Sequence, residues 1–266
     1  MAEQTVGLLH PGEMGAALGV VLLGRGFPVL WASEGRSAET AARAGEAGLE
    51  DAVSVDEVAR RSDVILSVCP PHAALDVARS LSGFTGVYVD ANAVSPATAR
   101  AIADTVARVV DGGIVGPPPR APGTTRLYLS GVEADSVADL FAGTPIDARL
   151  VSEEIGAASA VKMAYAAWTK GTAALLLAVR SLARIERVEP ALLEEWSLSL
   201  PELPERSVRA ARSAATKGWR WVGEMEEVAS TFAAAGLPEG FHLAAADVFR
   251  AITDDLAHAW PRGVPS

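Results

Sequence analysis

The chain has 266 residues, half of them hydrophobic, so it is long enough to form two domains that each bury a core. A net charge of −10 and a pI near 4.9 argue against nucleic acid and anionic membranes as partners. The single cysteine, Cys69, cannot form an internal disulfide and fits a reducing compartment. Because we find neither a signal peptide nor a membrane span in the sequence, we expect a soluble, cytoplasmic protein.

The first 150 residues alternate short strand-like runs with helix-like runs. The expected strands are Thr5–Leu9, Pro28–Ala32, Val64–Val68, Val87–Asp90, Val109–Val115, Arg126–Ser130 and Ala148–Val151. The expected helices between the early strands are Glu13–Gly24, Ser37–Gly45, Val55–Arg61, Ala73–Leu81 and Pro96–Ala107. This alternation predicts an α/β domain whose mostly parallel sheet carries helices on both faces.

The chain after residue 151 contains no strand-like run. Ser152, followed by two glutamates, has the composition of a helix start, and the helical pattern continues to about Arg187. Breaks in the remaining helical pattern fall at Pro190, Pro201, Pro204 and residues 236–238. We therefore predict two domains, residues 1–151 and 152–266, of which the second is all-α and is joined to the first by a long helix.

A glycine-containing turn follows the first strand. Its frame, His10-Pro11-Gly12-Glu13-Met14-Gly15, matches G-x-G-x-x-G except for histidine at the first glycine position. The N-terminus of the following helix offers N–H groups and a positive dipole to a pyrophosphate. Gly12 allows close approach of the phosphates, and Gly15 allows the helix to pack closely on the strand. We predict that His10, Pro11, Gly12, Glu13 and Met14 bind a dinucleotide cofactor.

The end of the second strand, "WASEGRS", indicates which dinucleotide is bound. Ser33 stands where an acid binds the ribose hydroxyls of NAD, and Arg36 with Ser37 suits the 2′-phosphate of NADP. Glu34 is the alternative, either as an acid for the ribose or as a solvated loop charge. We predict NADP as the cofactor and keep NAD as the less favoured alternative.

The segments "VGLLHPGEMG", "ILSVCPP", "VDANAVSP", "VDGGIVGPPP" and "GAASAVKMAY" resemble, in order and spacing, the β-hydroxyacid dehydrogenase superfamily. This superfamily includes 3-hydroxyisobutyrate and 6-phosphogluconate dehydrogenases, and the chain is most similar to its phosphogluconate-dehydrogenase-like branch. The resemblance implies an N-terminal Rossmann domain, a long interdomain helix, a helical C-terminal domain and a dimer. It also implies that Val68, Cys69 and Pro70 line the adenosine–ribose side of the cofactor, that Asn92 lies near the nicotinamide, and that Lys162 is catalytic.

Several polar positions of that superfamily differ in this chain. Val115 stands in place of a serine that binds the substrate carboxylate, Ala166 in place of an asparagine, and Asn92-Ala93 in place of a serine–threonine pair. A lysine on a later helix is replaced within a segment that contains Glu224, Glu226 and Glu227. These differences do not affect the dinucleotide-binding fold, but they argue against the usual hydroxyacid substrate of the superfamily. We assign Gly116 and Pro117, in the same loop as Val115, to substrate binding.

Lysine is rare in this chain: three of the 23 basic residues are lysine, and Lys162 and Lys170 lie on one apolar helix. An amine in an apolar setting can donate or accept a proton near neutral pH, which a guanidinium cannot. At about 100° per residue, Lys162, Tyr165 and Thr169 lie within about 60° of one another. We predict Lys162 as general acid or base, Tyr165 as proton donor or substrate contact, and Thr169 as substrate contact. The alternative is a solvated Lys162 beside a packed Tyr165.

These features predict an NADP-dependent oxidoreductase that moves a hydride between nicotinamide and a secondary alcohol or ketone. Imine reduction, or NADP binding without catalysis, are the alternatives. We expect no metal site, and we expect His242 and His258 to be packing or surface residues. Apolar residues nearly surround the segment 153–187, so the expected partners are a small-molecule substrate and a second copy of the chain, whose C-terminal helices pack on this segment.

Overall fold

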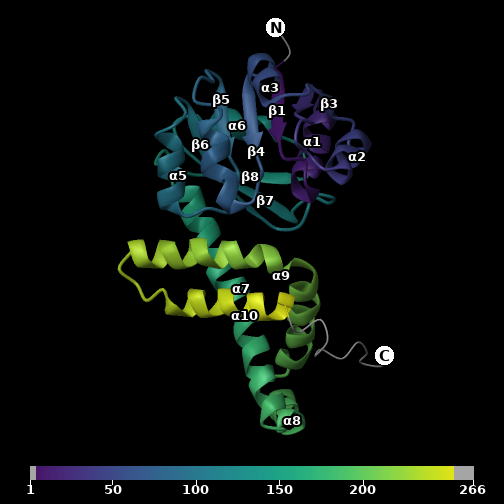
Figure 1. Ribbon diagram of the computed structural model, residues 1–266, viewed down its shortest axis with the longest axis vertical. Helices are drawn as coiled ribbons and strands as arrows, with labels where there is room; N and C mark the ends of the chain where they lie inside the picture. Colours follow the sequence, from purple (N-terminus) through teal and green to yellow (C-terminus); the bar gives the residue numbers. More distant parts are fainter. Residues whose placement is uncertain (1–3, 255–266) are drawn as a thin grey trace. The chain divides into compact units, whose positions relative to one another are not determined.

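The computed structural model describes residues 4–254, so His258 lies outside the described residues. The chain divides into two compact units, Met1–Met163 and Ala164–Ser266, and the division falls inside one long helix rather than after residue 151 (Figure 1). Within the described part of the chain, no helix combines the length and the apolar character that a membrane span requires. The α/β first unit and the helical second unit confirm the predicted fold class.

The first unit contains an eight-stranded sheet (Figure 1). Its strands are β1 (Val6–Leu9), β2 (Val29–Trp31), β3 (Glu50–Asp51), β4 (Val64–Ser67), β5 (Val87–Asp90), β6 (Val109–Val115), β7 (Thr125–Ser130) and β8 (Ile146–Ser152). They lie in the order β3-β2-β1-β4-β5-β6-β7-β8, and β6 with β7 is the antiparallel pair. The sheet is therefore mostly parallel, as the alternation of strands and helices predicts.

Helices cover both faces of the sheet. Successive residues of a strand point to opposite faces, so each strand contributes side chains to two cores. Val6 and Leu8 of β1 belong to a core that includes residues of α1, α2 and α6, and Leu9 belongs to a second core with residues of α3, α4 and α5. These helices, with one 3-10 turn, are α1 (Glu13–Gly24), α2 (Ala38–Glu46), α3 (Val55–Arg61), η1 (Pro71–Ala73), α4 (Ala74–Arg79), α5 (Pro96–Ala103) and α6 (Ala134–Leu140). The sequence pattern missed α6 and the two-residue strand β3.

The long helix α7 (Ala157–Ile185) begins later than predicted, and Ser152 is not its N-cap. Ser152 ends β8, and its hydroxyl accepts a hydrogen bond from the Glu154 N–H at 2.9 Å. Gly156 then has a φ of 98°, and a Cβ at this position would lie 2.9 Å from the Arg100 guanidinium. Pairing of β8 with β7, followed by a turn that requires glycine, overrides the local helix signal at Ser152.

The second unit contains the rest of α7 and three more described helices, α8 (Glu189–Ser199), α9 (Leu203–Ala234) and α10 (Gly240–Asp254). Pro190 and Pro204 lie in the first turns of α8 and α9, where a missing N–H costs nothing. Buried Arg180 of α7 donates to the Glu189 carboxylate at 2.6 and 2.9 Å and to the Ser207 hydroxyl at 3.0 Å. One guanidinium thus joins α7, α8 and α9.

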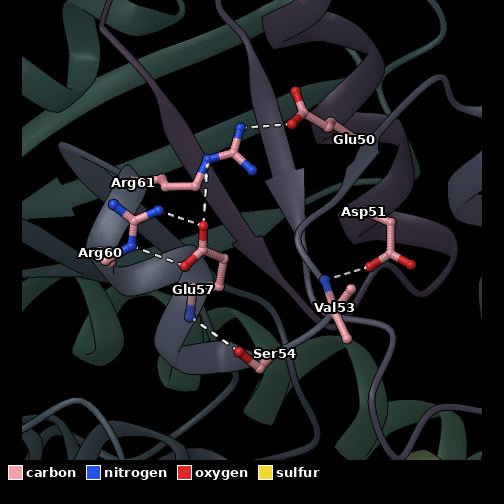
Figure 2. Close-up of polar contacts among 7 residues, drawn as sticks. All are labelled: Glu50, Asp51, Val53, Ser54, Glu57, Arg60 and Arg61. Carbon is pink, nitrogen blue, oxygen red and sulfur yellow. Dashed lines mark hydrogen bonds and ion pairs between the residues drawn. The ribbon is translucent and has the colours of Figure 1, made fainter.

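Ion pairs form within α3 and between α3 and the edge strand β3 (Figure 2). The Glu57 carboxylate accepts hydrogen bonds from Arg60, and Arg61 pairs with Glu50 of β3 at 2.6 Å. Between β3 and α3, the N–H of Val53 donates to the Asp51 carboxylate at 2.8 Å. Val53 has a φ of 70°, which is unfavourable for a β-branched residue, and its side chain is 62% exposed.

Val53→Asn should therefore raise the free energy of unfolding by about 1 kcal/mol, because asparagine tolerates the left-handed backbone and little burial is lost. Urea denaturation measures the change. Val132→Asn is the matched control, since Val132 is 83% exposed and has no positive φ. A Val53→Asn protein no more stable than the wild type would contradict the assignment of strain to this residue.

Candidate active site

The predicted cofactor residues lie at the end of the sheet where the parallel strands terminate, which we call its carboxyl edge. They follow the carboxyl ends of β1, β2, β4 and β5, which are mutually parallel. After β3 the chain crosses over β2 and β1 to form β4 on the other side of β1, so the strand order reverses between β1 and β4. In open α/β sheets, ligands bind at the carboxyl ends of the strands at such a point.

The turn after β1 has the geometry that a phosphate-binding turn requires. His10 has a φ of 66°, so histidine adopts the left-handed conformation at the first glycine position of the motif. A Cβ at Gly15 would lie 2.6 Å from the His10 carbonyl oxygen, whereas a Cβ at Gly12 would meet no atom within 4 Å. Gly12 is the N-cap of α1, and no side chain caps this helix. The helix N-terminus therefore opens onto space that an anion can enter.

Arg36 lies in the loop that follows β2. The Arg36 N–H donates to the Ser33 carbonyl at 3.0 Å, and the Ser37 hydroxyl caps α2 by accepting from the Thr40 N–H at 3.2 Å. The positive charge of Arg36 acts on both His10, after β1, and Cys69, after β4. Glu34, the alternative ribose ligand, is exposed. Arg36, which is half-buried, is thus the charged residue of this loop whose charge acts on the residues after β1 and β4.

The loops after β4 and β5 are joined by Asn92, which is buried. Its side-chain oxygen accepts from the Cys69 N–H at 2.5 Å, and its amide nitrogen donates to the Ser67 hydroxyl at 3.2 Å and to the Asp90 carboxylate. Burial raises the pKa of the Cys69 thiol to about 12, so the thiol stays protonated at neutral pH and is a poor nucleophile. Asn92 therefore fixes the two loops, with Val68 half-buried and Pro70 exposed beside them.

The first turn of α7 is bound to the sheet by a carboxylate that the sequence analysis did not single out. Asp111 of β6 is fully buried and accepts hydrogen bonds from the N–H groups of Gly156 and Ser159 at 3.0 Å and from the Ser159 hydroxyl at 2.6 Å. The Ser130 hydroxyl donates to Asp111 at 2.9 Å and accepts from the Ala158 N–H at 3.0 Å. These bonds satisfy N–H groups that a helix start otherwise leaves unpaired.

Lys162 lies one turn further along α7, against β6. A Cβ at Gly113 would lie 2.7 Å from the Ala158 carbonyl oxygen and 3.0 Å from the Lys162 Cβ, so glycine at this position allows the close approach. Lys162 is half-buried. Tyr165 and Thr169 follow on the same stripe of the helix, Tyr165 47% exposed and Thr169 donating to the Tyr165 carbonyl at 3.0 Å.

The predicted substrate loop lies in the connection between β6 and β7, residues 116–124. Gly116 has a φ of 120°, and a Cβ there would lie 2.2 Å from the Thr124 carbonyl oxygen. The Thr125 hydroxyl donates to the Pro117 carbonyl at 2.6 Å, and both Gly116 and Pro117 are exposed. Val115 is 3% exposed, so it offers no surface to a substrate.

In the second unit, Lys170 of α7 forms an ion pair with Glu224 of α9, and both side chains are largely buried. Glu224 belongs to the segment in which the resemblance leads one to expect a lysine. The pairing shows that the lysine at position 170 has a structural partner, which sequence spacing could not show.

Comparisons with known proteins concern the family and the fold of the chain. Residues 183–252 match the family model "Domain of unknown function (DUF1932)". The chain is 33% identical over 154 residues to an uncharacterized 28.5 kDa protein of Methanothermus fervidus, a match that covers 56% of this chain and 59% of that protein. The chain thus matches less than two thirds of the length of this curated relative.

Two solved structures share 27% identity with the chain. One is a conserved protein of unknown function described as structurally similar to 3-hydroxyacid dehydrogenases, with a TM-score of 0.72 and coverage of 97% of this chain and 100% of that one. The other is a conserved hypothetical protein from Sinorhizobium meliloti 1021, with a TM-score of 0.71 and coverage of 98% and 91%.

More distant structures share the fold alone. They are 3-hydroxyisobutyrate dehydrogenase from Mycobacterium tuberculosis, at 16% identity, TM-score 0.71 and coverage of 95% and 94%, and a reductive aminase from Aspergillus terreus, at 19% identity, TM-score 0.59 and coverage of 96% and 95%. The predicted resemblance is confirmed: the chain has the two-domain fold of the β-hydroxyacid dehydrogenase superfamily.

Asp111→Asn should lower the free energy of unfolding by about 3 kcal/mol, because an amide nitrogen then faces N–H donors in a buried site. Urea denaturation measures the loss. Asp104→Asn is the matched control at an exposed helix end, where we expect a change within about 0.5 kcal/mol. Equal effects of the two substitutions would show that Asp111 does not anchor α7.

Proposed function

We propose that the chain is an NADP-dependent oxidoreductase that transfers a hydride between nicotinamide and a secondary alcohol or ketone carbon of a small molecule. The observation that carries the proposal is the convergence of the predicted cofactor residues at the carboxyl ends of the parallel strands β1, β2, β4 and β5. There the N-terminus of α1 at Gly12 has no side-chain cap, a Cβ at Gly12 would meet no atom within 4 Å, and the positive charge of Arg36 acts on His10.

The residues at this edge fit a dinucleotide with a 2′-phosphate. The Nδ1 atom of His10 and the Nε atom of Arg36 are buried, and neither has a hydrogen-bond partner among the described residues. Buried polar atoms of this kind are costly unless a ligand pairs with them. Arg36 supplies a permanent positive charge for the 2′-phosphate, and the turn at Gly12 accepts the pyrophosphate.

Lys162 is the proposed general acid and base. NADPH, when bound, supplies the hydride, so the chain's own residues have to orient the substrate and move one proton. The ammonium of Lys162 donates its proton to the substrate oxygen in reduction, and the amine accepts it in the reverse direction. Asp111 fixes the helix turn that carries Lys162, and Tyr165 and Thr169 extend the same stripe as substrate contacts.

Imine reduction is the second candidate. Val115 is buried where the resemblance leads one to expect a carboxylate-binding serine, which weakens the case for a hydroxyacid substrate. A structure that shares this fold is a reductive aminase from Aspergillus terreus in complex with NADPH and ethyl levulinate, whereas another is a 3-hydroxyisobutyrate dehydrogenase with L-serine. A panel of ketones, 2-hydroxyacids and imines, assayed by NADPH absorbance, distinguishes the two chemistries from a silent cofactor-binding protein.

Lys162→Met should lower turnover on the best substrate of that panel by about a hundredfold or more and change NADPH affinity by only a few-fold. Methionine keeps most of the side-chain volume and removes the proton. Lys162→Arg should be nearly as damaging, since a guanidinium does not release its proton. Lys217→Met, at an exposed lysine, is the control. Wild-type turnover in Lys162→Met would direct the search for the proton donor to Tyr165.

Arg36→Ala should weaken NADPH binding by tenfold or more, because an arginine–phosphate contact contributes about 1.5–3 kcal/mol, and it should leave NADH binding nearly unchanged. Fluorescence titration measures both dissociation constants. Arg43→Ala removes the same charge from α2 and serves as the control. If the wild type binds NADPH and NADH equally, the assignment of NADP as the cofactor is wrong.

We also propose that the chain forms a homodimer through α7 and the C-terminal helices. Trp168, Leu175 and Leu182 are 67%, 61% and 60% exposed, and their seven-residue spacing places them on one stripe of the helix. A row of large apolar side chains is unfavourable in water unless a partner covers it, and a two-fold symmetric contact with a second copy presents a matching apolar surface.

Sedimentation equilibrium at micromolar concentration should give about twice the 27.5 kDa of one chain. Leu175→Glu should shift the mass toward one chain, because a charge is then buried in the contact. Leu198→Glu, at a leucine of α8 that is 77% exposed, should leave the dimer intact. A monomeric wild type would refute the proposal.

A further inference from the structure

His10 occupies a position that the backbone would fill more easily with glycine. Its φ of 66° belongs to the left-handed region, and its carbonyl oxygen accepts a hydrogen bond from the Gly12 N–H at 2.7 Å. The turn therefore requires this conformation regardless of the side chain. Histidine at this position brings an imidazole to the edge of the sheet at a cost in backbone energy.

The imidazole lies beside Arg36 and has an unused nitrogen. His10 Nδ1 and Arg36 Nε are both buried without a hydrogen-bond partner among the described residues, and the charge of Arg36 acts on His10. The two residues follow neighbouring parallel strands, β1 and β2. Acceptor oxygens of a bound anion would satisfy such nitrogens.

We propose that His10 is a second ligand, beside Arg36, of the 2′-phosphate of the bound dinucleotide, and that it takes up a proton when this phosphate binds. The inference rests on the proposed function, since it assumes a dinucleotide at this edge. His10 would then contribute to the recognition of the 2′-phosphate, and the affinity for the cofactor would depend on pH.

The charges around His10 determine the direction of this coupling. Burial, together with the positive charge of Arg36, lowers the pKa of His10 to about 4, and a hydrogen bond with the Leu9 backbone acts the other way. The N-cap of α1, at the positive end of the helix dipole, lies two residues after His10, and Glu13 of that helix is exposed. Cys69, after β4, is an uncharged thiol at neutral pH because burial raises its pKa. The free protein therefore holds His10 neutral.

A phosphate dianion reverses the sign of the local charge and raises the pKa of His10. Between the pKa of the free protein and that of the complex, binding takes up a proton, so the contribution of His10 to affinity grows as the pH falls. The imidazolium then donates from both nitrogens, whereas the neutral ring donates from one.

The test uses adenosine 2′,5′-bisphosphate as the probe and AMP, which lacks the 2′-phosphate, as its counterpart. Isothermal titration calorimetry near pH 6.5, in two buffers of different ionisation enthalpy, gives the affinity and the number of protons taken up. His10→Gly satisfies the backbone without an imidazole, and His10→Asn tolerates the left-handed conformation. His72→Asn is the control at an exposed histidine after the next strand, β4.

The wild type should take up more protons with the bisphosphate than either His10 variant and bind it about tenfold more tightly. The titration of the free bisphosphate is the same for every protein, so differences in proton uptake report on the complexes, in which His10 and the phosphate titrate as a pair. AMP affinity should be equal in all four proteins. Equal bisphosphate affinity and equal proton uptake in wild type and both His10 variants would overturn the inference and leave the proposed function standing. Failure of the wild type to bind either NADPH or the bisphosphate would overturn both.

Discussion

The buried carboxylate of Asp111 connects the sheet to α7, and the position of Lys162 depends on it. Four donors converge on this side chain, two from the backbone at the start of α7 and two from serine hydroxyls. Gly113, on the same strand, lets the helix approach so closely that a Cβ would touch Lys162. A helix start fixed from a distant strand holds a side chain more firmly than a helix start capped within its own turn, and proton transfer requires such a fixed position.

Four loops, after β1, β2, β4 and β5, carry the predicted cofactor residues at the carboxyl edge of the sheet. Asn92 connects the loop after β5 to the loop after β4 by a hydrogen bond, and the charge of Arg36, in the loop after β2, acts on His10 and Cys69. Because these residues follow strands on both sides of the point where the strand order reverses, one small molecule bound at this point would contact residues far apart in the sequence. The proposed activity follows from this convergence together with Lys162, and the substrate depends on the apolar residues that replace the expected polar anchors.

The sequence predicts the parts of this molecule whose signals are local. Period-two and helical patterns predict the core strands and most helices, and the glycine spacing predicts the turn after β1. Ser152 shows the limit: its helix-start signal is real, but pairing of β8 with β7 places it in a strand, and the actual cap comes from Asp111, far away in the chain. The pairing of Lys170 with Glu224 and the proximity of His10 to Arg36 are likewise products of tertiary structure, and residue spacing carries no information about them.

The central claim is that the protein moves a hydride beside Lys162. The most direct measurement uses NADPH in which deuterium replaces both hydrogens at C4 of the nicotinamide. It is incubated with the protein and a panel of ketones and imines, and the products are analysed by mass spectrometry. The account predicts that one class of product gains a single deuterium on the former carbonyl or imine carbon, and that Lys162→Met abolishes the gain while still binding NADPH. Tight binding of NADPH by the wild type without deuterium in any product would contradict catalysis and identify a cofactor-binding protein.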